Sequence, residues 1–464
     1  MLHKNNSRLG YTHSDVDIPS HNINHLTPLA QEVCRLMSHD PFLTQRTIAN
    51  RLQINSEQLL VVAAEIRADE DAQNYILYQG DGTKYWTNTI NPLLANGTLH
   101  AAIDREYMYP NRIGLYTGMS CMFYCNFCGR NPVAKYEKQY EQIGFDVFKQ
   151  IIDQDPKTDP YWEDRFRISG GLEPLTNRYL GDIIHYGAER GYKMQLYTNG
   201  FMMTDRYITD HPGMLELHAV RFSLYGVDKD SAFRVTRHTE SFDNIIENII
   251  NYINRAANTK VGVNWIVLPG QANDLQKLIN VVDYINTKAI RPVDFVTLRE
   301  DFSQNIRVIS EEERQHLIEI FKQIKDFKER KWPATHWDFG YALEPLTHGK
   351  STGALTMINW NEMVPESFPQ VAVAADVKGD VYVYHESGFL DRPGANRYII
   401  GNISDSSIED QVKSFITNKK SIRPMPPDVG YLDAFDHVVS RLIRQARDDE
   451  EFGIGWNQGP VTCR

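Results

Sequence analysis

Strand-like and helix-like stretches alternate through the middle of the chain, and this alternation constrains the fold more than any other feature. Short apolar runs rich in Val, Ile and Phe are typical of buried strands, and each is followed by a longer run with helical periodicity. The expected strands are the run that begins at Arg112 and residues 166–169, 194–197, 220–224, 262–268 and 293–298. The expected helices are residues 145–153, 178–189, 242–257, 273–287 and 310–328. Such units predict a parallel α/β sheet whose functional residues gather at the carboxyl ends of the strands.

Three of the five cysteines, Cys121, Cys125 and Cys128, lie within eight residues directly after the first expected strand. Thiolates at this spacing on one loop can face a single centre, and soft thiolates select iron–sulfur clusters, zinc or copper. A structural zinc site takes four protein ligands, whereas a cluster with one open iron needs three thiolates and leaves a position for another ligand. The spacing therefore favours an iron–sulfur cluster over the two alternatives, which are three buried structural thiols or a zinc site completed by a distant His.

Length and composition are those of a globular protein that can bury a full core. The chain has 464 residues, of which 42% are hydrophobic and 23% charged. No apolar run approaches membrane-spanning length, and the first thirty residues lack the apolar segment of a secretory signal, so we expect a cytoplasmic protein that does not bind membranes. A net charge of −11 disfavours broad binding to nucleic acid, although it allows a local basic pocket for a phosphorylated ligand.

Helical periodicity after an extended amino-terminal arm predicts a small helical domain before the first strand. Its middle portion, residues 44–63, resembles a helix-turn-helix, which would suggest DNA binding. Short patterns of this kind are common in helical domains that bind no DNA, so we expect a packing or lid domain. The alternative from another functional class is a regulator that binds zinc and DNA.

Polar and small residues follow the second and third expected strands. Gly170 and Gly171 allow the backbone to come close to a ligand, and Glu173 follows within reach of an ammonium group. Thr198 and Asn199 end the third strand, and their side chains can form hydrogen bonds with a ribose or with a substrate hydroxyl. These residues are candidates for binding a cofactor with an amino group and a sugar.

The later strands end in further candidates. Ser223 lies in the fourth strand and Arg234 follows it by eleven residues; an arginine can bind a carboxylate through two hydrogen bonds, but it could equally be a solvated helix residue. Leu268 ends the fifth strand and could lie against an adenine, although core packing would explain it equally well. The sixth strand ends in three charged residues, Arg299, Glu300 and Asp301, which suggest substrate recognition or proton transfer unless they form a solvated loop.

The carboxyl-terminal third adds further β-structure. Residues 370–389 alternate in hydrophobicity around Lys378-Gly379, which predicts a hairpin, and residues 336–343 could form another strand. We therefore divide the chain into an amino-terminal arm and helical domain (1–100), the βα units (108–330) and a carboxyl-terminal extension (331–464).

The Cys-x3-Cys-x2-Cys spacing, with Phe127 before the third cysteine, resembles that of radical S-adenosylmethionine (SAM) enzymes. The stretches "SGGLEPLTN", "YTNGF", "LHAVRFSLYG" and "DFVTLRED" are similar to members of this family that act in deoxyamino-sugar biosynthesis. The resemblance implies a partial (β/α)6 barrel. It also implies an extension similar to the SPASM or twitch type, without the cysteines that hold auxiliary clusters.

The resemblance further implies a 4Fe-4S cluster on the three cysteines, with SAM on the fourth iron. A 5′-deoxyadenosyl radical would take a hydrogen atom from a carbon of a nucleotide-linked sugar, and a neighbouring amine would leave as ammonia to give a keto-deoxy sugar. Oxidation of a hydroxyl to a ketone by the same radical is the alternative outcome. Phe127 and the strand-end residues from Gly170 to Leu268 would surround SAM, and Arg299, Glu300 and Asp301 would serve the substrate. An electron donor such as flavodoxin or ferredoxin is implied, while the oligomeric state is left open.

Overall fold

The computed structural model describes residues 22–39, 43–78, 91–125, 127–128, 134–268, 272–300, 310–338, 366–384, 394–423, 434–455 and 458–460. Statements about structure below refer to these residues. Of the candidate site residues named above, Asp301 lies outside these ranges, and only the backbone of Glu300 is described.

A ten-stranded sheet forms the centre of the described structure, with strand order β10-β9-β8-β1-β2-β3-β4-β5-β6-β7. The strands are β1 (Arg112–Tyr116), β2 (Phe166–Ile168), β3 (Gln195–Thr198), β4 (Ala219–Ser223), β5 (Lys260–Val267), β6 (Phe295–Glu300), β7 (His336–Asp338), β8 (Ala372–Asp376), β9 (Asp380–Tyr382) and β10 (Ile399–Asn402). Strands β1 to β7 pair in parallel and in sequence order. The predicted parallel α/β sheet is therefore confirmed.

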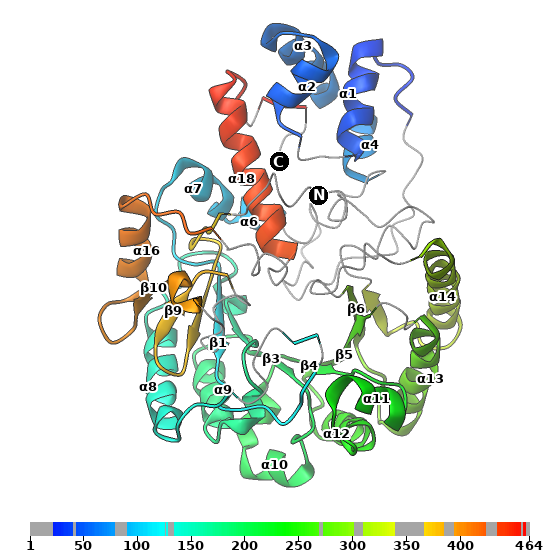
Figure 1. Cartoon of the computed structure of the whole chain (residues 1–464), viewed down its shortest axis with the longest axis vertical. Helices are drawn as coiled ribbons and strands as arrows, with labels where there is room; N and C mark the ends of the chain where they lie inside the picture. Colours follow the sequence, from blue (N-terminus) through cyan, green and yellow to red (C-terminus); the bar gives the residue numbers. More distant parts are fainter. Residues whose placement is uncertain are drawn as a thin grey trace.

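Helices cover one face of this sheet (Figure 1). They include α8 (Gln139–Asp153), α9 (Leu180–Glu189), α10 (Asp205–Asp210), α11 (Lys229–Thr236), α12 (Ser241–Arg255), α13 (Ala272–Lys288) and α14 (Glu311–Arg330). In α12, Ile245, Ile249 and Ile253 recur every fourth residue and are buried, because residues at this spacing share one side of a helix. They join a core with alternate strand residues such as Val220 and Phe222. The parallel pairing thus follows from apolar strand faces that need helices to cover them.

The hairpin predicted around Lys378-Gly379 extends the central sheet. Strand β9 pairs antiparallel to β8, and β8 pairs in parallel with β1, with Ile113 opposite Val373. Strand β10 and helix α16 (Ile408–Thr417) follow. Strand β1 is therefore bordered on both edges, by β2 and by β8.

The two ends of the chain share a second core. The helices of the amino-terminal region are α1 (Pro28–His39), α2 (Gln45–Leu52), α3 (Ser56–Ala68), α4 (Glu70–Tyr78), α6 (Asn91–Ala95) and α7 (Thr98–Asp104). Helix α18 (Ala434–Glu451) contacts both α2 and α7, and its Leu442 and Ile443 are buried in the same core as Ile48 and Ile66 (Figure 1). The three-part division of the chain stays a prediction. None of the described helices has the length and apolar character needed to cross a membrane.

We expect the replacement of Arg165 by Met to destabilise the barrel strongly. Arg165 precedes β2, and its Nε lies 2.7 Å from Asp155 Oδ2 while Nη2 contacts Asp159; all three side chains are at most 4% exposed. Because the change leaves two buried carboxylates without their cation, the free energy of unfolding should fall by about 3–5 kcal/mol. Urea unfolding measures this, and Arg190→Met, which removes a more exposed pair with Asp153, should cost less than about 1 kcal/mol. Equal losses in the two variants would contradict this view of Arg165.

The contact between α18 and α2 should depend on pH through Asp449. The Gln45 N–H donates to Asp449 Oδ1 at 2.6 Å, and burial raises the pKa of Asp449 from 3.8 to about 7. The folded protein therefore holds the proton of Asp449 more tightly than the unfolded chain does. The contribution of protonated Asp449 to stability is fully present below about pH 4 and is lost as the pH rises through 7. Asp449→Asn keeps the acceptor and cannot ionise, so unfolding followed from about pH 4 to 8 should show a smaller loss of stability than in the wild type. An unchanged pH profile would refute this role, and Glu450→Gln, at an exposed residue of the same helix, is the control.

Candidate cofactor and active site

The cysteine loop begins at the carboxyl end of β1. Cys121 and Cys125 are half-buried and Cys128 is exposed, and the Cys128 N–H donates to the Cys125 carbonyl at 3.1 Å. Burial raises the pKa of Cys125, and the nearby thiols of Cys128 and Cys121 raise it further. The three thiols therefore lie close enough for their charges to affect the pKa of Cys125.

Three thiols are a donor set that suits an iron–sulfur cluster. Among the described residues, no three His, Cys, Asp or Glu side chains are arranged to hold a metal ion as they stand. Three thiols on one loop repel each other as thiolates, and the positive charge of iron would offset that repulsion and the burial of Cys125. The residues fit the group, provided that the thiols turn toward a common centre.

Phe127 connects the cysteine loop to the end of β4. Its ring meets the ring of Tyr225 edge-on at 4.9 Å between centroids, an arrangement that aromatic pairs favour. Tyr225 is hydrogen-bonded to Ser223. Burial raises the pKa of the Tyr225 hydroxyl, and the nearby thiol of Cys125 raises it further. Sequence reasoning missed Tyr225, although its position two residues after Ser223 in "SLYG" could have indicated it.

The turn after β2 holds the base of the cysteine loop through Thr176. Its Oγ1 accepts hydrogen bonds from the N–H groups of Met119 at 2.9 Å and Ser120 at 3.1 Å, and it lies 2.6 Å from the Glu173 carbonyl. The Glu173 N–H donates to the Ser120 carbonyl at 2.9 Å, and Asn177 Nδ2 donates to the Thr117 carbonyl at 2.8 Å. Residues 117–120 are therefore fixed before the first cysteine is reached. Sequence reasoning did not identify Thr176.

The buried carboxylate of Glu173 already accepts hydrogen bonds from three groups of the chain. These are the N–H groups of Leu175 at 3.1 Å and Asn199 at 2.8 Å, together with the hydroxyl of Thr198. Burial raises the pKa of Glu173 although these donors oppose that effect. Glu173 therefore joins the ends of β2 and β3, and its contact with the amino group of SAM stays a prediction. Asn199 also reaches the loop, since its Nδ2 lies 3.2 Å from Met122 Sδ.

The two glycines after β2 adopt backbone conformations that other residues rarely take. Gly170 has φ of 71° and Gly171 has φ of 66°. A Cβ on Gly170 would lie 2.5 Å from Tyr116 Cε1. Gly118 lies equally close to the turn, because a Cβ there would lie 2.3 Å from the Leu172 carbonyl oxygen. Leu172, which follows the glycine pair, thus packs its backbone directly on the segment that leads to the cysteines.

Not all of the remaining candidate residues lie beside the cysteine loop in the structure. Arg234 is exposed on α11, where its Nη2 lies 3.2 Å from Asp274 Oδ2 on α13, so its contact with a SAM carboxylate stays a prediction. Leu268 is buried directly after β5. Arg299 lies in β6 and is half-buried, and Glu300 is the last residue of that strand, opposite Val267. The roles of these residues and of Asp301 stay predictions.

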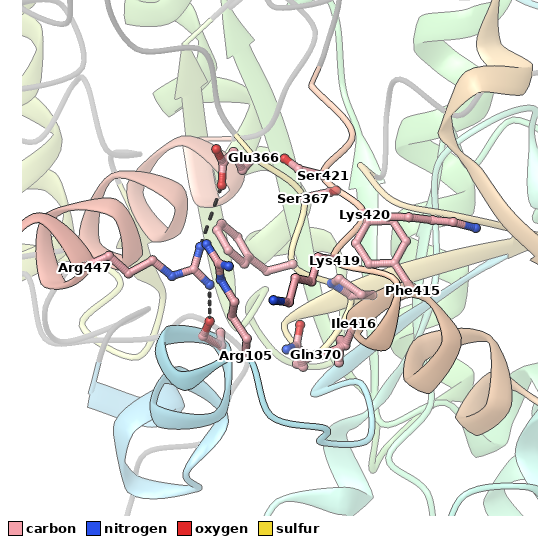
Figure 2. A pocket seen from close by; sticks show the side chains of 13 residues that line it. Arg105, Glu366, Ser367, Gln370, Phe415, Ile416, Lys419, Lys420, Ser421 and Arg447 are labelled. Carbon is pink, nitrogen blue, oxygen red and sulfur yellow. Dashed lines mark hydrogen bonds and ion pairs between the residues drawn. The ribbon is translucent and has the colours of Figure 1, made fainter.

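A separate pocket lies at the amino-terminal edge of the sheet (Figure 2). Its lining comes from α7, α16, α18 and residues 366–370, and the Gln370 carbonyl accepts from the Asn111 N–H next to β1. Arg447 donates to the Ala102 carbonyl at 2.7 Å and lies 3.8 Å from Glu366 Oε2. This pocket therefore lies at the amino ends of the strands, whereas the cysteine loop lies at their carboxyl ends. Arg447, which lines the pocket, has partners within the chain.

Comparison with known proteins gives one close sequence relative. No family model matches the chain. The chain is 35% identical over 386 residues to the dTDP-4-amino-4,6-dideoxy-D-glucose ammonia-lyase of Streptomyces venezuelae, and the match covers 82% of this chain and 78% of the relative.

Solved structures show a looser likeness. SuiB of Streptococcus suis bound to S-adenosylmethionine has 11% identity and a TM-score of 0.45, and the match covers 76% of this chain and 74% of that one. The structure of anSMEcpe with bound AdoMet has 12% identity and a TM-score of 0.43, with 74% and 96% covered. From the sequence relationship and the cysteine loop, the chain belongs to the radical SAM family that includes the Streptomyces ammonia-lyase.

Proposed function

We propose that the protein is a radical SAM ammonia-lyase that removes the amino group of a nucleotide-linked deoxyamino sugar. The observation that carries this proposal is the 35% identity across most of both chains to an enzyme named for that reaction on a dTDP-linked sugar. The three-cysteine loop at the carboxyl end of β1 supports it, because chemistry in parallel α/β barrels takes place at that edge.

Cys121, Cys125 and Cys128 would hold the 4Fe-4S cluster and leave one iron for SAM. When bound, these cofactors supply a 5′-deoxyadenosyl radical that removes a hydrogen atom from the sugar. The SAM molecule would lie against Phe127 and the strand ends. The residues proposed for this contact are Gly170, Gly171, Glu173, Thr198, Asn199, Ser223, Arg234 and Leu268.

In this proposal the side chains of the protein position the cofactors and keep water away from the reaction. Thr176 and Glu173 fix the base of the cysteine loop through backbone hydrogen bonds. The ring of Phe123 packs against the rings of Phe201 and His238, with 5.7 Å and 5.5 Å between centroids, so aromatic rings pack behind the loop. A fixed site from which bound cofactor and substrate exclude water would favour a radical reaction over side reactions with solvent.

The substrate end of the site belongs to β6 in this proposal. Arg299, Glu300 and Asp301 would bind the sugar or move the proton between the hydroxyl and the leaving amine. A reduced flavodoxin or ferredoxin would supply the electron, and a reducing compartment such as the cytoplasm suits the free thiols.

The product distinguishes elimination from oxidation. Anaerobically reconstituted enzyme supplied with SAM and reduced flavodoxin should release ammonia from dTDP-4-amino-4,6-dideoxyglucose in step with formation of a keto-deoxy sugar. The physical reason is that a positioned amine next to a radical carbon can leave, whereas a hydroxyl leaves less easily. Mass spectrometry with an enzymatic ammonia assay measures both products. A ketone formed without ammonia would replace the lyase by a dehydrogenase.

Thr176→Val should loosen the cysteine loop without removing a cluster ligand. Valine has nearly the same shape but cannot accept from the N–H groups of Met119 and Ser120, and unsatisfied donors of this kind cost about 1–3 kcal/mol. We expect less iron to be retained after gel filtration of reconstituted protein. The control Thr209→Val removes an exposed hydroxyl on α10 that bonds the Asp205 carbonyl, and it should retain iron like the wild type. Full retention in Thr176→Val would show that the hydrogen bonds of Thr176 do not position the loop.

A further inference from the structure

The face of the sheet opposite the helices carries arginines on several strands. Residues that pair across parallel strands share a face with each other and with residues two positions away. Arg167 pairs with Gln195, and Tyr197 pairs with Arg221. By the same register, Arg112 and Arg299 lie on this face; we call Arg112, Arg167, Arg221 and Arg299 the inner arginines.

The side chains of the inner arginines converge. The Arg221 guanidinium lies 5.0 Å from the ring centroid of Tyr197 on the neighbouring strand β3 and 5.1 Å from that of Phe295 on β6, so two aromatic rings contact it. Burial alone would raise the pKa of Tyr197, yet its pKa is lowered because Arg221 and the other inner arginines stabilise the phenolate. Burial and the charge of Arg112 lower the pKa of Arg167 to about 10, so it still carries its charge at neutral pH.

Acidic groups also lie on this face. Asp338 pairs with Thr297 and Asp376 pairs with Tyr116, which places both at the strand ends of the inner face, and Asp164 precedes β2. Asp376 accepts from the hydroxyls of Tyr136 and Tyr382, and burial raises its pKa. By register, Lys260 and His336 add two further basic side chains to the same face.

Three buried polar side-chain atoms on the same face have no hydrogen-bond partner within the described residues. They are Gln195 Nε2, Asn264 Oδ1 and Thr297 Oγ1, and each residue is at most 7% exposed. An unsatisfied buried polar atom is costly, so such atoms gather where a polar ligand or ordered water completes the site. Their position among the inner arginines points to an anionic ligand with several hydrogen-bonding groups.

We propose that the inner arginines bind the diphosphate of the nucleotide-linked substrate, with Arg167 and Arg221 as the principal donors. This rests on the proposed function and names the place where its substrate binds. A carboxylate, such as that of SAM, needs a single guanidinium, whereas a diphosphate offers many anionic oxygens to several planar forks. Arg221 lies two residues before Ser223, about 7 Å along the strand, so a diphosphate there lies next to the cofactor edge.

Calorimetric titration of the anaerobically reconstituted enzyme tests the proposal with dTDP, inorganic pyrophosphate and thymidine as probes. The wild type should bind dTDP, pyrophosphate should compete with it, and thymidine should bind much more weakly. Arg167→Gln and Arg221→Gln should each weaken dTDP binding roughly tenfold to a hundredfold, since hydrogen bonds to charged groups contribute about 1.5–3 kcal/mol. Arg221→Lys should lose less than Arg221→Gln. Arg206→Gln, on an exposed arginine of α10, should bind dTDP like the wild type.

Unchanged dTDP affinity in both Gln variants would overturn the proposal. So would wild-type binding that pyrophosphate does not reduce, a result that needs no variant to fold. Thermal melting confirms that each variant is folded. If both Gln variants release ammonia with an unchanged KM, the diphosphate site is refuted but the lyase function stands. If dTDP binding depends on the arginines but the amino sugar yields no ammonia, the lyase function alone is refuted.

Discussion

The placement of β1 between two parallel neighbours is the constraint on which the site depends. β1 is hydrogen-bonded to β2 on one edge and to β8 on the other, so its carboxyl end cannot shift along the sheet. The turn after β2 then binds the next residues through Thr176 and Glu173. The cysteine loop therefore starts from a fixed backbone.

The same sheet separates two chemical tasks by its two faces. One face is apolar and buries Val220, Phe222 and their neighbours under helices, which supplies the stability of the fold. The other face carries polar and cationic side chains, including Arg167 and Arg221, which would be costly without an anionic ligand or counter-charges. A stable scaffold and a charged interior thus come from alternate residues of the same strands.

The sequence was informative where a local pattern determines the structure. The alternation of strand and helix predicted β1 to β6 and the helices α8, α9, α12, α13 and α14, but not α10 or α11. The repeat around Lys378-Gly379 predicted the β8–β9 hairpin. It was less informative where the outcome depends on contacts between distant residues. The pairing of β8 with β1, the packing of α18 on α2 and the hydrogen bonds of Thr176 leave no local pattern. Arg167 and Arg221 escaped notice because only the strand register shows that they share a face.

The central claim is that three thiolates leave one iron of a cluster free for SAM. Its most direct test is the cleavage of SAM by reduced, reconstituted protein, measured as 5′-deoxyadenosine together with the iron and sulfide content. The account predicts iron and sulfide in equal amounts in the wild type, with 5′-deoxyadenosine formed, and no 5′-deoxyadenosine from Cys125→Ala. A wild-type protein that takes up no iron, or a Cys125→Ala variant that cleaves SAM as well as the wild type, would contradict it.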